Sequence, residues 1–172
     1  MESEILKFTV AILVNNQFGV LNRVTSMFRR RQFNISSLTV SETESEDFSR
    51  ITVQSEGDVI KKEQLVNQLY KLPDVVSVAE LAGEEIISRE LLLIKIRNCP
   101  ETRGEIRSAM DAFEGKILDY TKDSLTIQLV GDSLKIDNFI TLMKDFDIME
   151  ICRTGIVSLQ RGATTIRKVT NL

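Results

Sequence analysis

The segment between Ile12 and Val40 combines a polar loop and a glycine in a way that suits the binding of a small anion. An apolar stretch leads into the loop Asn15-Asn16-Gln17-Phe18-Gly19, and a helical pattern opens at Val20. The first N–H groups of a helix are unpaired and carry partial positive charge, so a carboxylate beside Gly19 and Val20 would meet donors and a favourable field. Glycine also allows close approach to the backbone. The loop therefore predicts a site for a small anionic ligand.

Residues that could carry catalysis are scarce. The 172 residues include no histidine, the commonest general base and metal ligand. No GxxxxGK[ST], GxGxxG, GxSxG or CxxC sequence occurs. Several carboxylates crowd one polar run, a pattern more typical of a solvated turn than of an acid/base pair: Glu42, Glu44, Glu46 and Asp47. Catalysis by this chain is poorly supported.

Two other functions deserve comparison. Small acylphosphatases hold an acyl phosphate with an arginine and an asparagine near a first loop, but here Arg23 falls inside the first predicted helix, and Asn16 and Asn22 do not reproduce that loop. An RNA-recognition module needs exposed aromatic residues on central strands and a basic sheet. The strand around Ile51 and Val53 supplies neither.

Charge and hydropathy set further limits. The net charge of −3 and the pI near 5.2 give no general attraction to nucleic acid. Apolar stretches are shorter than the ~18–20 residues of a membrane span, and Met1 to Glu4 is acidic, unlike a signal peptide. Cys99 and Cys152 lack metal or redox spacing and are expected to be free thiols. We expect a soluble, cytoplasmic protein with no nucleic-acid or membrane partner.

Hydrophobic periodicity predicts six elements in the first half of the chain. Strands alternate apolar and polar residues, and helices repeat apolar residues every three or four positions. The predicted elements are a strand at 8–14, a helix at 20–28, strands at 35–40 and 51–53, a helix at 65–72 stopped by Pro73, and a strand at 75–78. This order is that of the ferredoxin-like α+β fold, a four-stranded antiparallel sheet with two helices on one face. The other face is expected to be left for a partner.

The second half repeats the first. Ile51-Thr52-Val53-Gln54 leads to Gly57-Asp58 as Leu125-Thr126-Ile127-Gln128 leads to Gly131-Asp132, and the following helix faces match at the same offset. Such self-similarity predicts two tandem ferredoxin-like (βαββαβ) domains, at 1–82 and 83–172. The second module has a helix predicted to open with a capping box at Thr102 and to stop at Gly115. Its loop Cys99 to Thr102 lacks the asparagine and glycine, so no second pocket is expected.

The chain closely resembles the small subunit of acetolactate synthase, also called acetohydroxyacid synthase, whose N-terminal domain is an ACT domain. The resemblance covers almost the whole chain and is carried by 16–24, Phe28, Arg31, 34–35, 37–40, 49–50, 52–54, 57–58, 89–96, Phe113, 115–119, 128–131 and the closing run 153–162.

By this resemblance the chain is a non-catalytic regulatory subunit. It would bind a separate catalytic (large) subunit that carries thiamine diphosphate, Mg and FAD, raise its activity, and confer feedback inhibition by valine or a related branched-chain amino acid such as isoleucine. No cofactor would be bound by this chain. The alternative is a stand-alone ACT-type amino-acid-binding regulator of another partner.

The resemblance also implies a site at the seam of a homodimer. The first loop of one protomer meets the entrance of the second strand of the other, and the matching residues are Asn16, Gly19, Val20, Leu21, Asn34 and Ile35. The amides of Gly19 and Val20 would bind the carboxylate of the effector. The side-chain oxygens of both asparagines would accept from its ammonium group, and Leu21 and Ile35 would contact its aliphatic side chain. Each residue also has a structural explanation: the asparagines as turn or cap residues, Leu21 and Ile35 as core, and Gly19 as a tight turn.

Two positions depart from the usual pattern of the family. Phe18 stands where proline or a small residue is frequent, and Gln32-Phe33 replaces a frequent Gly-Tyr. If the backbone at Gln32 has a positive φ, the substitution costs ~1 kcal/mol relative to glycine. These changes bear on the affinity and identity of the effector, not on the fold.

Overall fold

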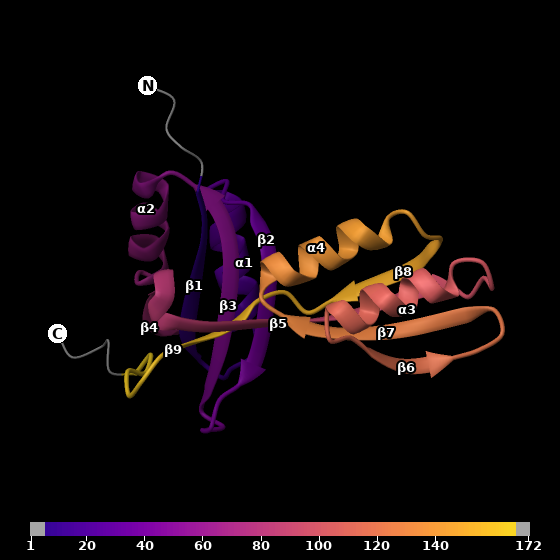
Figure 1. Ribbon diagram of the computed structural model, residues 1–172. Coiled ribbons are helices and arrows are strands. Elements are labelled where there is room, and N and C mark those ends of the chain that lie inside the picture. Colours follow the sequence, from indigo (N-terminus) through magenta and orange to yellow (C-terminus); the bar gives the residue numbers. More distant parts are fainter. Residues whose placement is uncertain (1–5, 168–172) are drawn as a thin grey trace. The chain divides into compact units, whose positions relative to one another are not determined.

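The computed structural model describes residues 6–167, and the acidic segment at Met1 to Glu4 lies outside them. The chain divides into two compact units (Figure 1). The described part of the first comprises 6–87 and 156–167, and the second is Ser88–Gly155. Each unit is a layer of helices on an antiparallel sheet, which confirms the α+β fold with tandem ferredoxin-like modules. No helix among residues 6–167 is long and apolar enough to cross a membrane.

The first unit has strand order β2-β3-β1-β4, with helices α1 and α2 on one face (Figure 1). Alternate residues of β1, Val10, Ile12 and Val14, are at most 1% exposed and pack in one core with Phe28 of α1 and Leu65 of α2. Ala11 and Leu13, which point to the opposite face, are at most 1% exposed as well, so β1 is buried on both faces and not mainly on one. The elements are β1 Leu6–Asn15, α1 Val20–Arg30, β2 Ile35–Glu42, β3 Phe48–Gly57, α2 Val59–Leu69, β4 Val75–Leu81 and the short 3-10 helix η1 Gly83–Glu85.

The second unit repeats this arrangement with strand order β6-β7-β5-β8 and helices α3 and α4. Asp58 and Asp132 cap α2 and α4, and each side chain accepts from the backbone N–H three residues on at 2.8 Å. Identical capping follows from the repeated Gly-Asp. The elements are β5 Ile86–Arg97, α3 Arg103–Ala112, β6 Lys116–Tyr120, β7 Ser124–Gly131, α4 Ser133–Met143 and β8 Ile148–Arg153, and the chain closes with β9 Val157–Gln160, which pairs with β5.

The closing segment, residues 156–167, belongs to the first unit, although the repeat in sequence assigned it to the second domain. It lies on the sheet face opposite α1 and α2. Thr39 Oγ1 donates to the carbonyl of Ile156 (3.4 Å), and Ser77 Oγ donates to the carbonyl of Ile166 (2.8 Å). The prediction that this face is left for a partner is therefore wrong, because residues of the closing segment cover it. Backbone carbonyls of that segment accept hydrogen bonds from the polar side chains on this face.

Helices α1 and α3 end in left-handed residues that are not glycine. Gln32 and Glu114 both have φ 57°, and the next amide bonds back five residues, from Phe33 to Phe28 (3.0 Å) and from Gly115 to Met110 (2.8 Å). This is the Schellman geometry, in which glycine usually takes the left-handed position. Gln32 therefore meets the condition under which this position costs more than a glycine, a positive φ. Gly115 does not stop α3 by its φ; a Cβ there would lie 2.8 Å from Met110 Cγ.

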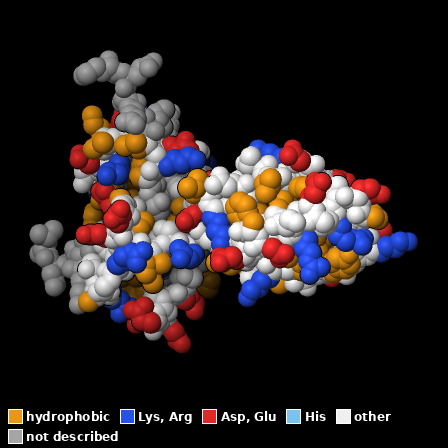
Figure 2. Space-filling model, in the orientation of Figure 1, with side chains coloured by type: hydrophobic (Ala, Val, Ile, Leu, Met, Phe, Trp, Pro, Cys, Tyr) orange, Lys and Arg blue, Asp and Glu red, His pale blue; other side chains and the backbone are white. Residues whose placement is uncertain are grey.

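The capping box predicted at Thr102 is wrong. Thr102 precedes α3 with helical φ/ψ and caps no backbone N–H with its side chain, whose Oγ1 instead donates to the carbonyl of Cys99 at 3.5 Å. A capping side chain needs an extended backbone at that position to face the first turn. The acidic turn predicted at 42–47 is exposed, and Figure 2 shows acidic side chains gathered at the tip of the β2–β3 hairpin.

Replacing Gln32 by glycine is expected to stabilise the first unit by about 1 kcal/mol, because glycine adopts a positive φ without the steric cost paid by other residues. The matched control is Arg31→Gly, at φ −99°, which is expected to destabilise by about 0.5–1 kcal/mol. Urea unfolding of the purified chain measures both changes. Equal loss of stability in the two variants would contradict the argument.

Candidate functional site

The N-terminus of α1 has the geometry of an anion site. Gly19 has φ +81° and precedes the helix without any side-chain cap. Val20 N–H donates weakly to the Gln17 carbonyl (3.3 Å), whereas the N–H groups of Gly19, Leu21 and Asn22 have no acceptor in the described part of the chain. These groups point out of the first turn, where the helix dipole is positive. The N–H groups of Gly19, Leu21 and Asn22 are therefore free to donate to a carboxylate.

Arg23 places a charged side chain next to Gly19, although the sequence predicted no role for this residue in effector binding. A Cβ built on Gly19 would lie 3.4 Å from Arg23 Nη1, so the guanidinium borders the glycine. Its Nε is bound to Asp74 Oδ2 at 2.5 Å. The signal in sequence was the i, i+4 spacing of Gly19 and Arg23, which places both on one helix face. Because Asp74 holds this arginine, it is also poorly placed to bind an acyl phosphate.

Asn16 joins the loop to the β2–β3 hairpin. Its Nδ2 donates to the Glu46 carbonyl (2.9 Å) and to Glu42 Oε1 (3.3 Å), and its Oδ1 accepts from Ser49 Oγ (3.0 Å). Asn16 therefore has the structural role of a turn residue, because its side chain holds the loop to the hairpin. An amide oxygen has two lone pairs, and one remains for a ligand.

The other candidate residues divide between core and surface. Val20 is 3% exposed and packs in the core, so only its backbone could reach a ligand. Leu21 is 41% exposed, which leaves its side chain available for contact. Asn34 is exposed and its carbonyl accepts from Ser55 Oγ at 2.5 Å, while Ile35 is half-buried against the core.

The two halves of the candidate site lie at opposite ends of the sheet within one chain. The loop follows Asn15, which pairs with Phe48 of β3, whereas Ile35 pairs with Ser55 of the same strand. Seven residues of strand separate Phe48 from Ser55, about 23 Å at a rise of ~3.3 Å per residue. One chain therefore does not bring Asn34 and Ile35 to the loop.

The corresponding loop of the second unit is closed. The amide of Asn98 donates to the Asp123 carbonyl (3.1 Å) as that of Asn16 does to the Asp47 carbonyl (2.8 Å), so the two asparagines are equivalent. Asn98 is 6% exposed, and its side chain binds the Thr121 carbonyl (2.6 Å) and Arg103 Nε (2.9 Å). The expectation that this loop lacks an asparagine equivalent is wrong. No left-handed glycine precedes α3, and the amide group is consumed internally.

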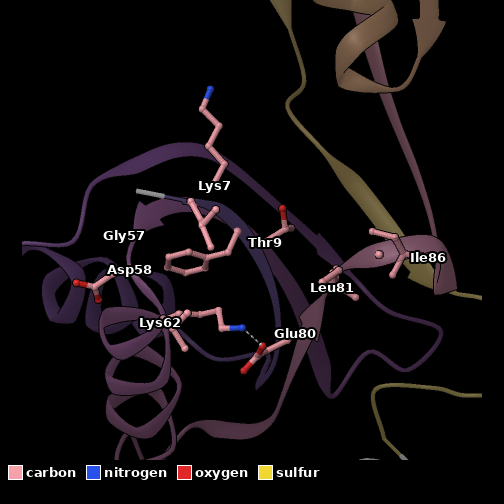
Figure 3. Close-up of a pocket in the computed structure, with 13 residues that line it drawn as sticks. Lys7, Thr9, Gly57, Asp58, Lys62, Glu80, Leu81 and Ile86 are labelled. Carbon is pink, nitrogen blue, oxygen red and sulfur yellow. Dashed lines mark ion pairs between the residues drawn. The ribbon is translucent and has the colours of Figure 1, made fainter. Parts of the chain in front are cut away.

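A separate cavity of about 360 Å³ lies near the start of β1 (Figure 3). Lys62 of α2 and Glu80 of β4 line it and form an ion pair, with their charged groups 2.7 Å apart. Because Lys62 and Glu80 neutralise each other, this pair gives the cavity no net charge with which to bind a charged ligand.

The fold and the loop define a class of protein: a duplicated α+β chain whose first module has a left-handed glycine and unpaired helix amides at the start of α1. Comparison with known families identifies that module. Residues 10–77 match the description "AHAS small subunit-like ACT domain", and residues 89–162 match "Small subunit of acetolactate synthase".

Individual relatives agree over nearly the full length. The chain is 46% identical over 157 residues to a probable acetolactate synthase small subunit of Archaeoglobus fulgidus, covering 91% of this chain and 98% of the relative. It is 42% identical to the acetolactate synthase small subunit of Bacillus subtilis, covering 91% and 92%. The crystal structure of the small subunit from Thermotoga maritima superposes with a TM-score of 0.85 at 38% identity, covering 92% and 99%. The chain belongs to the family of acetolactate synthase small subunits.

Proposed function

We propose that this chain is the non-catalytic regulatory subunit of an acetolactate synthase, which activates the catalytic subunit and confers feedback inhibition by valine or a related branched-chain amino acid. The observation that carries the effector site is the left-handed Gly19 before α1, with the free N–H groups of Leu21 and Asn22 beside it. Thiamine diphosphate, Mg and FAD would be held by the catalytic subunit, and the chain would act in the cytoplasm.

A homodimer would complete the effector site. β2 is an edge strand of the first sheet and has one unpaired edge, which a second copy could pair with by a two-fold axis. In antiparallel pairing of two β2 strands, the start of one strand meets the end of the other. Asn34 and Ile35 of one copy would then approach Glu42 of the other, to which Asn16 is bound at 3.3 Å. A two-fold dimer would therefore bring together two halves of the effector site that lie ~23 Å apart within one chain.

The chemistry of this seam suits an aliphatic amino acid. The amides of Gly19 and Leu21 would receive the carboxylate. The free lone pair of Asn16 Oδ1 and the side chain of Asn34 from the second copy would accept from the ammonium. Leu21, with an exposed side chain, and Ile35 would contact the hydrocarbon part.

Reconstitution with the catalytic subunit tests the proposal as a whole. We expect co-purification of the two chains, a rise in acetolactate production on adding this chain, and loss of that activity with valine, leucine or isoleucine. Failure to activate the synthase, with amino-acid binding retained, would favour a stand-alone ACT-type regulator of another partner. Absence of both would remove the proposal.

Replacing Asn16 by alanine is expected to weaken effector binding by about 10-fold, because the loop loses its ties to the hairpin and an acceptor for the ammonium. The matched control is Gln17→Ala, an exposed neighbour in the same loop, for which affinity should stay within about 2-fold of wild type. Calorimetry with valine, leucine and isoleucine measures both. Unchanged affinity in Asn16→Ala would exclude this residue from the site.

A further inference from the structure

The start of β3 lies between the candidate loop, residues 15–19, and the closing segment. Successive residues of a strand point to opposite faces of a sheet. Ser49 lies on the face covered by the helices, because Ile51, two positions further on, packs in the core of the first unit. Phe48 and Arg50 therefore point to the opposite face, which the closing segment covers. Three consecutive strand residues thus contact two parts of the chain that are distant in sequence.

On the face covered by the helices, Ser49 holds the loop through Asn16. Ser49 is 9% exposed, and its Oγ donates to Asn16 Oδ1 at 3.0 Å. The backbone N–H of Asn16 also donates to the carbonyl of Asp47 at 2.8 Å, one residue before β3 begins. The position of Asn16 is therefore set by the first residues of this strand. The same side-chain oxygen is the acceptor that the proposed function assigns to the ammonium group of the effector.

On the opposite face, two arginines join the start of β3 to the closing segment. Arg50 Nη2 donates to the carbonyl of Ser158 at 2.7 Å. The guanidinium carbon of Arg167 lies 4.9 Å from the centroid of the Phe48 ring. A hydrogen bond from a charged donor and a cation over an aromatic ring both restrict the groups that they join. The closing segment therefore restrains the two strand residues that flank Ser49.

We propose that the closing segment fixes Asn16 in its binding position through the start of β3, and that Arg50 and Arg167 are positioning residues of the effector site. This inference rests on the proposed function, which assigns Asn16 to that site. Because Ser49 lies between Phe48 and Arg50, a shift of the backbone at either neighbour moves the Ser49 hydroxyl away from Asn16. Substitutions along such a contiguous set of contacts change affinity by a few-fold or more, although they touch no ligand.

Nuclear magnetic resonance of the free, full-length chain tests the positioning through the side-chain amide resonances of Asn16, assigned with Asn16→Asp. Arg50→Met should shift these resonances and speed the exchange of the amide hydrogens with water, and Arg167→Met should do so to a smaller extent. The matched control is Arg161→Met. Arg161 belongs to the same segment, but its Nε donates to the carbonyl of Glu84 in η1 (2.9 Å) rather than to β3. Unchanged Asn16 resonances in Arg50→Met would overturn the proposal.

Calorimetry with valine measures the consequence for binding. Arg50→Met should weaken valine binding by about 5-fold, whereas Arg161→Met should stay within about 2-fold of wild type. Arg50→Lys keeps a charged donor for the Ser158 carbonyl and should recover most of the affinity. Wild-type affinity in Arg50→Met would also overturn the proposal. If the wild-type chain binds none of valine, leucine and isoleucine, the proposed function fails, and the Asn16 resonances still decide whether the closing segment positions the loop.

Discussion

Replacing Arg153 by methionine is expected to destabilise the second unit by about 3–5 kcal/mol, the largest stability effect we expect of a polar residue in the chain. Arg153 Nε lies 2.5 Å from Glu90 Oε2, and Nη1 lies 2.7 Å from Asp137 Oδ1. Glu90 is only 3% exposed and also binds Ser133 Oγ. Removing the arginine would leave a buried carboxylate without its counter-charge, which costs far more than the pair itself contributes.

The electrostatics of Arg153 point in the same direction. Burial by itself would lower the pKa of its guanidinium, but the hydrogen bonds to Glu90 and Asp137 raise the pKa above its usual value. The charged form is therefore favoured in the folded state. The pair also joins β5 to β8 next to the backbone bond from Thr154 N–H to the Leu91 carbonyl (3.1 Å), so its loss should loosen this strand end.

Urea unfolding of Arg153→Met measures the loss in free energy of unfolding, and two control variants show whether the buried charge of Glu90 causes it. Arg97→Met breaks an ion pair of the same length, 2.5 Å to Asp147, but with side chains 51% and 61% exposed, and should cost far less stability than Arg153→Met. Adding Glu90→Gln to Arg153→Met removes the orphaned charge and should recover part of the loss. Similar costs for Arg153→Met and Arg97→Met would show that burial of Glu90 is not the cause.

Replacing Gly19 by aspartate is expected to weaken valine binding by at least about 100-fold and to abolish feedback inhibition. The new carboxylate would lie at the N-terminus of α1, where it repels the carboxylate of the effector and competes for the same amides. Aspartate tolerates a left-handed backbone better than most residues, so the φ of +81° should not prevent folding.

Gly19→Asn is the matched control, because asparagine has nearly the same size and the same tolerance of a left-handed backbone but no charge. Its steric effect alone is expected to weaken valine binding by about 10-fold. Calorimetry gives the two affinities, and valine titration of the reconstituted synthase gives the two inhibition constants. If asparagine and aspartate weaken valine binding equally, the loop does not recognise the carboxylate of the effector by charge.

Much of the fold follows from local sequence patterns. The apolar residues Val10, Ile12 and Val14 predict a strand, and the structure buries them, but Ala11 and Leu13 are buried as well, so the prediction of one covered face is wrong. The spacing of Leu65 and Leu69 predicts the buried face of α2. The predictions of the strand and of the helix face succeed because the period of apolar residues is set by the geometry of a single strand or helix. The candidate loop was found in the same way, since a helix start and a glycine are neighbours in sequence.

Features that depend on packing between distant segments were missed or predicted wrongly. The cap at Thr102 fails because the backbone there is helical, and Glu114 rather than Gly115 is the left-handed residue that ends α3. Nothing in the local sequence says that Arg153 meets Glu90, 63 positions earlier. The proposed roles of Asn34 and Ile35 remain predictions, because they need a second copy of the chain.

The sequence by itself determined the duplicated α+β modules, the family and the loop that opens at Gly19. Each of these depends on residues within about one element of each other, whose conformations are limited by local sterics and periodicity. Only the tertiary structure decided what covers the second face of the first sheet, which charges are neutralised and which are left open. Those outcomes depend on burial and on partners brought together from distant parts of the chain, as with Arg50 and the closing segment, and no local pattern encodes them.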